Sequence, residues 1–278
     1  MFFIPFLITK KTHYNSLSKI FVYLITYVIP EFLLVFLANF QNQIIDWKFY
    51  IIFLLSFISF VNYYEIGYIF NETETIKRET DPTKRLTEEQ LLFYEKHKFF
   101  IYFERVIITV ILNFLLSFLI STQSIILFCC SEIICLIIFF VYNCVRGGRI
   151  TQIIYLFLSI FKYITITFCF SEMLNLSIFV AGIFVFPIVR TIEYKAHYGE
   201  DSNVNQFFRK YIIKYNINKI PVFRVFATLI LFLISVLLVL LNICNFIPVI
   251  LCGYMFLYRF ALWFAVKLGA NFKGYLKR

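Results

Sequence analysis

Histidine is scarce in this sequence, and the cysteines lack the spacing of a metal site. The chain has 3 histidines, at positions 13, 97 and 197, and only His197 lies near a charged motif. The 7 cysteines form no C-x-x-C pair and lie in or at the ends of apolar runs, which indicates small packing residues in place of a metal centre or a disulfide framework. The sequence therefore offers no obvious catalytic histidine.

Glycine and proline are also scarce. The chain has 8 glycines and 6 prolines, most of them near the ends of apolar runs or in loops. Transporters built from discontinuous helices place such residues near the bilayer midplane. A noncatalytic lipid transporter or scramblase is therefore an alternative with little support in the composition.

Apolar residues are abundant, at 61% of 278 residues, and aromatic residues reach 21%. A helix needs roughly 20 apolar residues to cross a bilayer, and eight runs of about that length are present. The sequence thus predicts an all-α integral membrane protein, one transmembrane domain over residues 1–278. The predicted spans are 18–38, 49–71, 99–119, 122–143, 150–170, 174–191, 221–241 and 245–266.

The basic residues predict the orientation of the chain. With the N-terminus inside, only Lys48 falls in an outside segment, while Arg105, Lys162 and Arg259 fall within helices and the other lysines and arginines lie in inside segments. This asymmetry follows the positive-inside rule and places both termini in the cytoplasm. The net charge of +10 is therefore a topology signal, and we expect no nucleic-acid partner.

Two inside loops, 72–98 and 192–220, are long and charged, and acids cluster where each leaves its helix. Long loops in a compact protein are usually functional or disordered, and this composition favours function. Asn62, Glu65, Glu72 and Glu79 fall close to one stripe of a continuous helix. Carboxylates at a helix end suit Mg²⁺ bound through substrate phosphates, and the interleaved lysines and arginines could hold phosphate oxygens.

The motifs resemble those of the UbiA superfamily of intramembrane prenyltransferases, which has an N-D-x-x-D-x-x-x-D pattern after its second helix. Here "NETETIKRE" puts Asn71 and Glu72 in the first places and Glu79 in the last acidic place, while Thr75 takes the middle place and Glu74 comes one residue early. The elements that follow the family's fourth and sixth helices resemble "YNCVRGGR" at 142–149 and "RTIEYKAHYGED" at 190–201.

The closer resemblance is to the bacterial decaprenyl-phosphate phosphoribosyltransferases. Their first motif is followed by a P-T-K-R segment, similar to "DPTKRL" here, their second motif is basic and aromatic, and a basic residue lies within helix five, where this chain has Lys162. The resemblance implies a Mg²⁺-dependent site with Asn71, Glu72, Glu74 and Glu79 at its centre. Glu72, Glu74 and Glu79 would be the metal ligands, and the implied substrate-binding residues are Glu65, Lys84, Arg85, Tyr142, Arg146, Lys162, Tyr194 and Lys195.

The implied reaction transfers a 5-phosphoribosyl group from phosphoribosyl diphosphate to a polyprenyl phosphate, at the cytoplasmic face of a bacterial inner membrane. The product would serve the synthesis of a cell-envelope polysaccharide. A UbiA-type prenyltransferase, moving a prenyl group from a prenyl diphosphate to an aromatic acceptor, remains the main alternative. A noncatalytic relative and a homo-oligomer are both compatible with the sequence.

Overall fold

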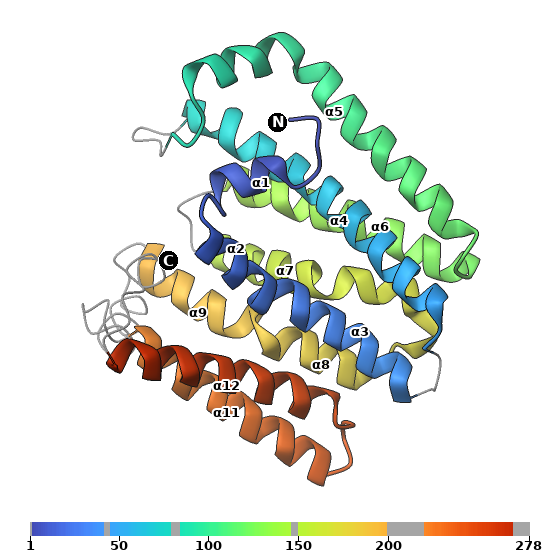
Figure 1. Ribbon diagram of the computed structural model, residues 1–278, viewed down its shortest axis with the longest axis vertical. Coiled ribbons are helices and arrows are strands. Elements are labelled where there is room, and N and C mark those ends of the chain that lie inside the picture. Colours follow the sequence, from blue (N-terminus) through green and yellow to red (C-terminus); the bar gives the residue numbers. More distant parts are fainter. Residues whose placement is uncertain (1, 42–44, 79–83, 146–149, 199–219, 269–278) are drawn as a thin grey trace. The chain divides into compact units, whose positions relative to one another are not determined.

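The computed structural model describes residues 2–41, 45–78, 84–145, 150–198 and 220–268, and these are helical with no strand (Figure 1). Eight helices in this part of the chain are long and apolar enough to cross a membrane. The protein is therefore an all-α, multi-span membrane protein, which confirms the predicted fold class. The spans are Leu17–Phe40, Trp47–Lys77, Glu88–Ser117, Thr122–Cys144, Ile150–Phe170, Leu176–Glu193, Pro221–Leu240 and Ile247–Lys267.

The described parts of the two predicted loops contain more helix than expected. The third span begins at Glu88, well before the predicted position 99, because Thr87 and Gln90 form a reciprocal capping box at that end. A short 3₁₀ helix, Thr75–Arg78, follows the long α-helix Trp47–Thr73 after one residue and forms the end of the second span. After the sixth span the helix continues to Tyr198.

The chain divides into two compact units, each assembled from segments that are separated in the sequence. Unit 1 comprises Met1–Tyr23, Asn42–Cys144 and Thr165–Met173, and unit 2 comprises Leu24–Gln41, Val145–Ile164 and Leu174–Arg278. That the two form one transmembrane domain, as the sequence predicts, stays a prediction.

Unit 1 is organised around the long helix α4, which packs against α5 and α6, with the short N-terminal helix α1 beside it (Figure 1). Asp46 caps α4 by accepting a hydrogen bond from the Phe49 amide at 3.1 Å. Its elements are α1 (Leu7–Thr12), α2 (Leu17–Tyr23), α4 (Trp47–Thr73), η2 (Thr75–Arg78), α5 (Glu88–Ser117), α6 (Thr122–Cys144) and η3 (Thr165–Met173).

Unit 2 contains the hairpin of α11 and α12, and α12 packs in turn on α8 and α3 (Figure 1). Helix α7 contacts α8 and α9. Asn175 caps α8, and a break at Phe186 separates α8 from α9, which begins with Pro187. Its elements are the π-helix η1 (Leu24–Val28), α3 (Ile29–Gln41), α7 (Ile150–Ile164), α8 (Leu176–Val185), α9 (Pro187–Tyr198), α11 (Ile220–Leu240) and α12 (Ile247–Lys267).

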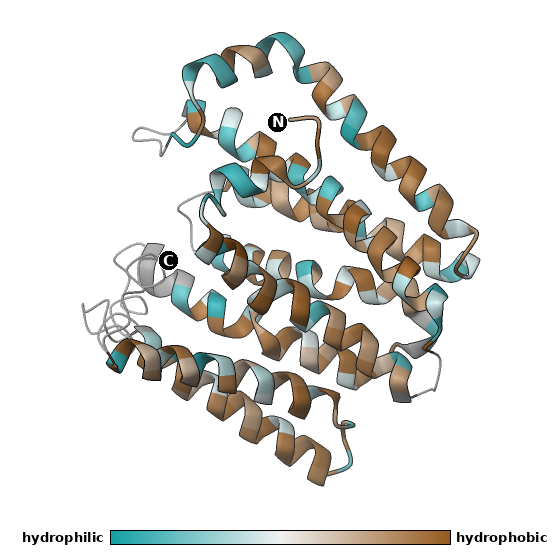
Figure 2. Cartoon of the chain, in the orientation of Figure 1, coloured by the Kyte–Doolittle hydropathy of each residue, from teal (hydrophilic) through white to brown (hydrophobic). Residues whose placement is uncertain are grey.

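Large apolar side chains cover the outer surfaces of the spanning helices. Phe99 and Val110 on α5 are 71% and 60% exposed, and Ile230 and Leu257 of the α11–α12 hairpin are 55% and 64% exposed. Figure 2 shows hydrophobic residues along most of α6 and α11. Such surfaces are stable in lipid rather than in water, so the exposed faces agree with a membrane location.

Close packing of α4 against α6 depends on Gly67. A Cβ atom built at this position would lie 2.2 Å from the Phe139 ring, which is itself held between Tyr64 and Tyr68 with ring centroids 4.8 and 5.3 Å away. The ring therefore has little freedom to move aside, and the two helices approach closely because residue 67 has no side chain.

We expect Gly67→Ala to lower the free energy of unfolding by about 1–3 kcal/mol, as overpacking does elsewhere. Thermal unfolding of the purified protein in detergent measures this effect. Gly253→Ala is the matched control: it makes the same change within a helix, but its Cβ would lie 3.3 Å from Phe232. Equal unfolding midpoints for the two variants would contradict the role assigned to Gly67.

Candidate functional site

The predicted acidic motif and the basic segment that follows it lie together at the end of α4. Glu72 is buried in the last turn, and its Oε1 accepts a hydrogen bond from Asn71 Nδ2 at 3.3 Å. Arg85 donates to the same oxygen through Nη1, and its side chain is 37% exposed. The chain thus folds back so that Arg85 reaches the carboxylate, while neighbouring Lys84 is exposed.

Glu74 belongs to a second, more open cluster. Its carboxylate pairs with Lys77 at 2.8 Å and accepts a hydrogen bond from the Tyr94 hydroxyl at 2.8 Å. Lys77 also pairs with Glu95 on α5. These contacts join the 3₁₀ turn after α4 to the beginning of α5, so the cluster fixes the path of the chain where the span ends.

The described acids do not form a preorganised metal site. No group of three or more histidine, cysteine, aspartate or glutamate side chains is placed to hold a metal ion in the part of the chain that the structure describes. Glu72 and Glu74 each accept a hydrogen bond from a cationic side chain instead, and Glu79 lies outside the described residues. The predicted Mg²⁺ site and its ligands stay a prediction.

Glu65, predicted to support substrate binding, has structural partners. It forms an ion pair with Arg105 at 3.0 Å, and both side chains are at most 1% exposed. Its carboxylate also accepts hydrogen bonds from the backbone amides of Phe6 at 2.7 Å and Thr9 at 2.9 Å. Glu65 therefore fastens the N-terminal segment to α4, and a role in substrate binding stays a prediction.

Arg105 extends this network from α5. Its guanidinium donates to the Phe2 carbonyl at 3.0 and 2.7 Å, to the Ile4 carbonyl at 3.1 Å and to Asn62 Oδ1 at 2.7 Å. Asn62, the first residue of the predicted polar stripe, in turn donates to the Arg105 carbonyl at 2.8 Å. The deeper part of that stripe is a polar network inside the bundle of unit 1.

Lys162 in unit 2, predicted to contact the acceptor phosphate, lies at membrane depth on α7. Its ammonium is 4.4 Å from the centre of the Tyr27 ring, and it interacts electrostatically with Glu31, which is fully buried in α3. An acid in the middle of a spanning segment is rare enough to indicate function. Glu31 was missed in the sequence because its apolar run was read only as a span.

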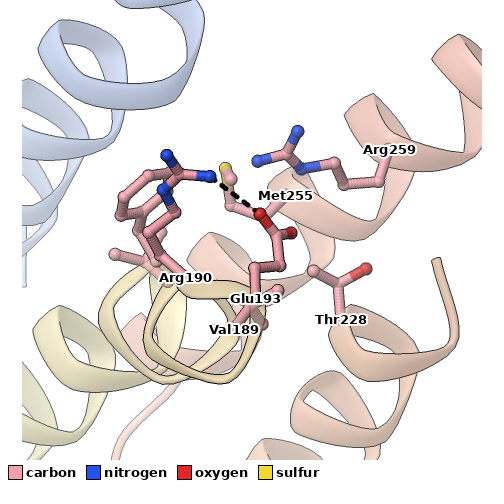
Figure 3. Close-up of a pocket in the computed structure, with 8 residues that line it drawn as sticks. Val189, Arg190, Glu193, Thr228, Met255 and Arg259 are labelled. Atoms are coloured by element: carbon pink, nitrogen blue, oxygen red, sulfur yellow. Dashed lines mark hydrogen bonds and ion pairs between the residues drawn. The ribbon is translucent and has the colours of Figure 1, made fainter. Parts of the chain in front are cut away.

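A cluster of arginines in unit 2 was not predicted. Glu193 on α9 pairs with Arg190 at 3.0 Å and with Arg224 of α11 through two hydrogen bonds of 2.6 and 2.9 Å. Arg259 of α12 faces the same carboxylate across a small pocket (Figure 3). The pocket lining is completed by Val185, Phe186, Val189, Thr228 and Met255.

The sequence contained a signal for this cluster, but its arginines were interpreted only as part of the charge distribution along the chain. Arg190 and Arg224 contribute to the positive-inside pattern, and Arg259 is a cation inside an apolar run. Three basic residues placed near one end of three spans indicate a shared polar site once those spans pack together. Only the tertiary contacts show that Glu193 joins them.

The remaining predicted residues are partly described. Tyr142 is half-buried, with its ring centroid 6.5 Å from that of Phe139. The backbone of Tyr194 and Lys195 lies in α9, but their side chains and the whole of Arg146 lie outside the described residues. Their predicted roles stay predictions.

Comparison of the chain with models of protein families, with curated proteins and with solved structures gives no match. Membership of the UbiA superfamily therefore stays a prediction that depends on the motifs. What the structure adds is the geometry of two groups of polar residues, one in each unit.

We expect breaking the Glu65–Arg105 pair to destabilise unit 1 strongly. Glu65→Gln leaves a buried guanidinium without its counter-charge, so the free energy of unfolding should fall by about 3–5 kcal/mol, and the N-terminal segment should become sensitive to protease. Unfolding in detergent and limited proteolysis measure the two effects.

The matched control is Lys98→Gln, which breaks a 3.9 Å pair with Glu95 on the same helix α5, where both side chains are exposed. Exposed pairs contribute about 0–1 kcal/mol. A Glu65→Gln protein as stable as Lys98→Gln, with an intact N-terminal segment, would show that the pair does not anchor this segment.

Proposed function

We propose that this membrane protein is a transferase that moves a 5-phosphoribosyl group from phosphoribosyl diphosphate to a polyprenyl phosphate, with diphosphate as the leaving group. The proposed location is the cytoplasmic face of a bacterial inner membrane, with both termini in the cytoplasm. The family resemblance supplies the donor and acceptor, and the structure supplies supporting geometry at the end of α4.

The observation that carries the proposal is the contact between the basic segment and the acidic motif that precedes it in the chain. Glu72 forms an ion pair with Arg85, so a guanidinium group lies at the end of α4. Lys84, the residue before Arg85, is exposed. A guanidinium can bind two phosphate oxygens at once, and an ammonium acts as a compact point charge. Together they suit a diphosphate that arrives from the aqueous side.

The chemistry needs stabilisation of charge more than proton transfer. The bond between the anomeric carbon and the diphosphate oxygen breaks, and its electron pair leaves with the diphosphate. An oxygen of the polyprenyl phosphate forms the new bond to that carbon. The lipid phosphate is already an anion, so no general base is required, in agreement with the scarcity of histidine.

Arg85 and Lys84 would act on the leaving group. Negative charge grows on the diphosphate as the bond breaks, and fixed cations aimed at that charge lower the barrier. Glu72 would position Arg85 through their ion pair, and Asn71 would orient Glu72 through its hydrogen bond. Removal of a single preorganised donor in other enzymes reduces turnover by about 10²–10³-fold.

Other parts of the proposal depend on the resemblance alone. Dependence on Mg²⁺ is one of them, because the described acids do not form a metal site by themselves. Tyr142 and Tyr194 are proposed to position the ribose, and Arg146, Lys162 and Lys195 to contact phosphate groups.

The transfer assay uses purified protein in detergent with polyprenyl phosphate, Mg²⁺ and radiolabelled phosphoribosyl diphosphate, and follows label into the lipid phase. We expect transfer that EDTA abolishes. Label that stays in the aqueous phase, with turnover of a prenyl diphosphate and an aromatic acid instead, would favour the prenyltransferase alternative. Absence of turnover with both substrate pairs would favour a noncatalytic lipid transporter or a noncatalytic relative.

Glu72→Gln and Lys84→Ala should each reduce transfer by about 10²-fold or more, because the first releases Arg85 and the second removes a phosphate contact. Glu88→Gln is the control, since it removes an exposed carboxylate at the start of α5 and should leave transfer unchanged. Unfolding midpoints confirm that each variant is folded. Normal transfer by both site variants would remove the assignment of the site.

A further inference from the structure

A buried acid in unit 1 lies within a span and has neutral hydrogen-bond partners. Glu132 lies near the middle of α6 and is 2% exposed. The described side chains that form hydrogen bonds with its carboxyl group are Ser59 of α4 and Asn113 of α5, and neither carries a charge. An ionised carboxyl group that is buried without a counter-charge is so unfavourable that it normally takes up a proton instead, and an acid inside a span indicates function.

Glu132, Asn113 and Ser59 form a closed ring of three hydrogen-bond contacts. Asn113 Nδ2 lies 2.7 Å from Glu132 Oε2, and Ser59 Oγ lies 2.7 Å from Asn113 Oδ1. The ring is closed by Ser59 Oγ and Glu132 Oε1, which are 3.1 Å apart. A serine hydroxyl has one hydrogen, so Ser59 can donate in only one of its two contacts.

The ring needs one hydrogen that its two neutral members do not supply. Each of the three contacts requires a hydrogen, and the Asn113 amide supplies one while the Ser59 hydroxyl supplies another. An ionised Glu132 would leave two oxygen atoms facing each other without a hydrogen between them. A proton on Glu132 completes the ring, because Glu132 then donates to Ser59, Ser59 to Asn113 and Asn113 to the second oxygen of Glu132. The count is the same if the Asn113 amide is rotated by half a turn.

The titratable groups around Glu132 do not provide a positive charge. Tyr63 of α4, Cys129 of α6 and Cys169 of η3 interact electrostatically with its carboxyl group, and α5 contributes the neutral Asn113. A phenol and two thiols are largely neutral at neutral pH and become negative when they ionise. Their ionisation would therefore add to the cost of a negative charge on Glu132.

Polar side chains continue from the ring along the interface of α4 and α5. One turn from the ring, Asn62 donates a hydrogen bond to Thr109 at 2.9 Å, and one turn beyond lies the Glu65–Arg105 ion pair. The members of this column are spaced by three residues along α4 and by four along α5, so they share one face of each helix. The column gives a proton a polar route between Glu132 and the end of α4.

We propose that Glu132, Asn113 and Ser59 form a proton-binding site in the membrane-spanning part of unit 1. Glu132 is a carboxylic acid at neutral pH, and the ring holds its exchangeable proton. When the proton leaves at high pH, Ser59 can no longer serve both of its contacts, so the packing of α4, α5 and α6 becomes dependent on pH. The site does not depend on the proposed transfer reaction, and failure of the transfer assay would leave it standing.

Infrared difference spectroscopy of the purified full chain, in a detergent without carbonyl groups, measures the protonation directly. Subtraction of the Glu132→Gln spectrum from the wild-type spectrum at neutral pH should show the C=O band of a carboxylic acid, and this band should shift in D₂O because the proton exchanges. Glu88→Gln is the matched control, the same change at an exposed position, and should remove only the bands of a carboxylate. A carboxylate signal from Glu132, or an acid band that does not shift in D₂O, would overturn the proposal.

Unfolding measured as a function of pH is the second test. Glu132→Gln should be at least as stable as the wild type at neutral pH, because an amide makes the same contacts as the protonated acid. As the pH rises above neutral, the wild type should lose stability relative to the variant, since its folded state holds a proton that the unfolded state has released. For one proton the folding equilibrium constant falls about tenfold per pH unit. Parallel pH profiles, or a variant that is less stable than the wild type at neutral pH, would contradict a proton on Glu132.

Discussion

The energetic penalty for an unbalanced charge inside an apolar helix bundle is the constraint on which the rest of this structure depends. A membrane-spanning bundle has few polar groups, so each buried ion needs a partner within the fold or from outside it. Unit 1 meets this requirement internally. Arg105 is surrounded by the Glu65 carboxylate, the Asn62 side chain and backbone carbonyls, and the network ties the N-terminal segment to α4 and α5.

Unit 2 has a second network of charges. Glu193 pairs with Arg190 and Arg224, and its carboxylate also interacts electrostatically with Arg259. Deeper in the same unit, Lys162 lies against the Tyr27 ring near Glu31, which gives that cation both an aromatic and an anionic neighbour. In both units the buried charges therefore lie beside groups of opposite sign.

The location of the spans could be predicted because the hydrophobic length of a helix is a local property of the sequence. The polar turns of α5 that precede the predicted span were not expected from the sequence, although their cause is equally local, since the Thr87 and Gln90 capping box starts the helix at Glu88. The contacts of Glu65 were harder to predict. A buried carboxylate indicates function in general, but its partners come from Phe6, Thr9 and Arg105, which are distant in the sequence.

By itself the sequence determined an all-α chain of eight spans, with an acidic helix end followed by a basic segment. The reason is that the length of an apolar run, its hydropathy and the spacing of a motif are all properties of the linear sequence. Only the tertiary structure decided which charges meet: that Arg85 returns to Glu72, and that Arg224 and Arg259 join Arg190 around Glu193. The physical reason is that ion pairs and pockets form between helices whose packing depends on shape and on close approach, which no single segment encodes.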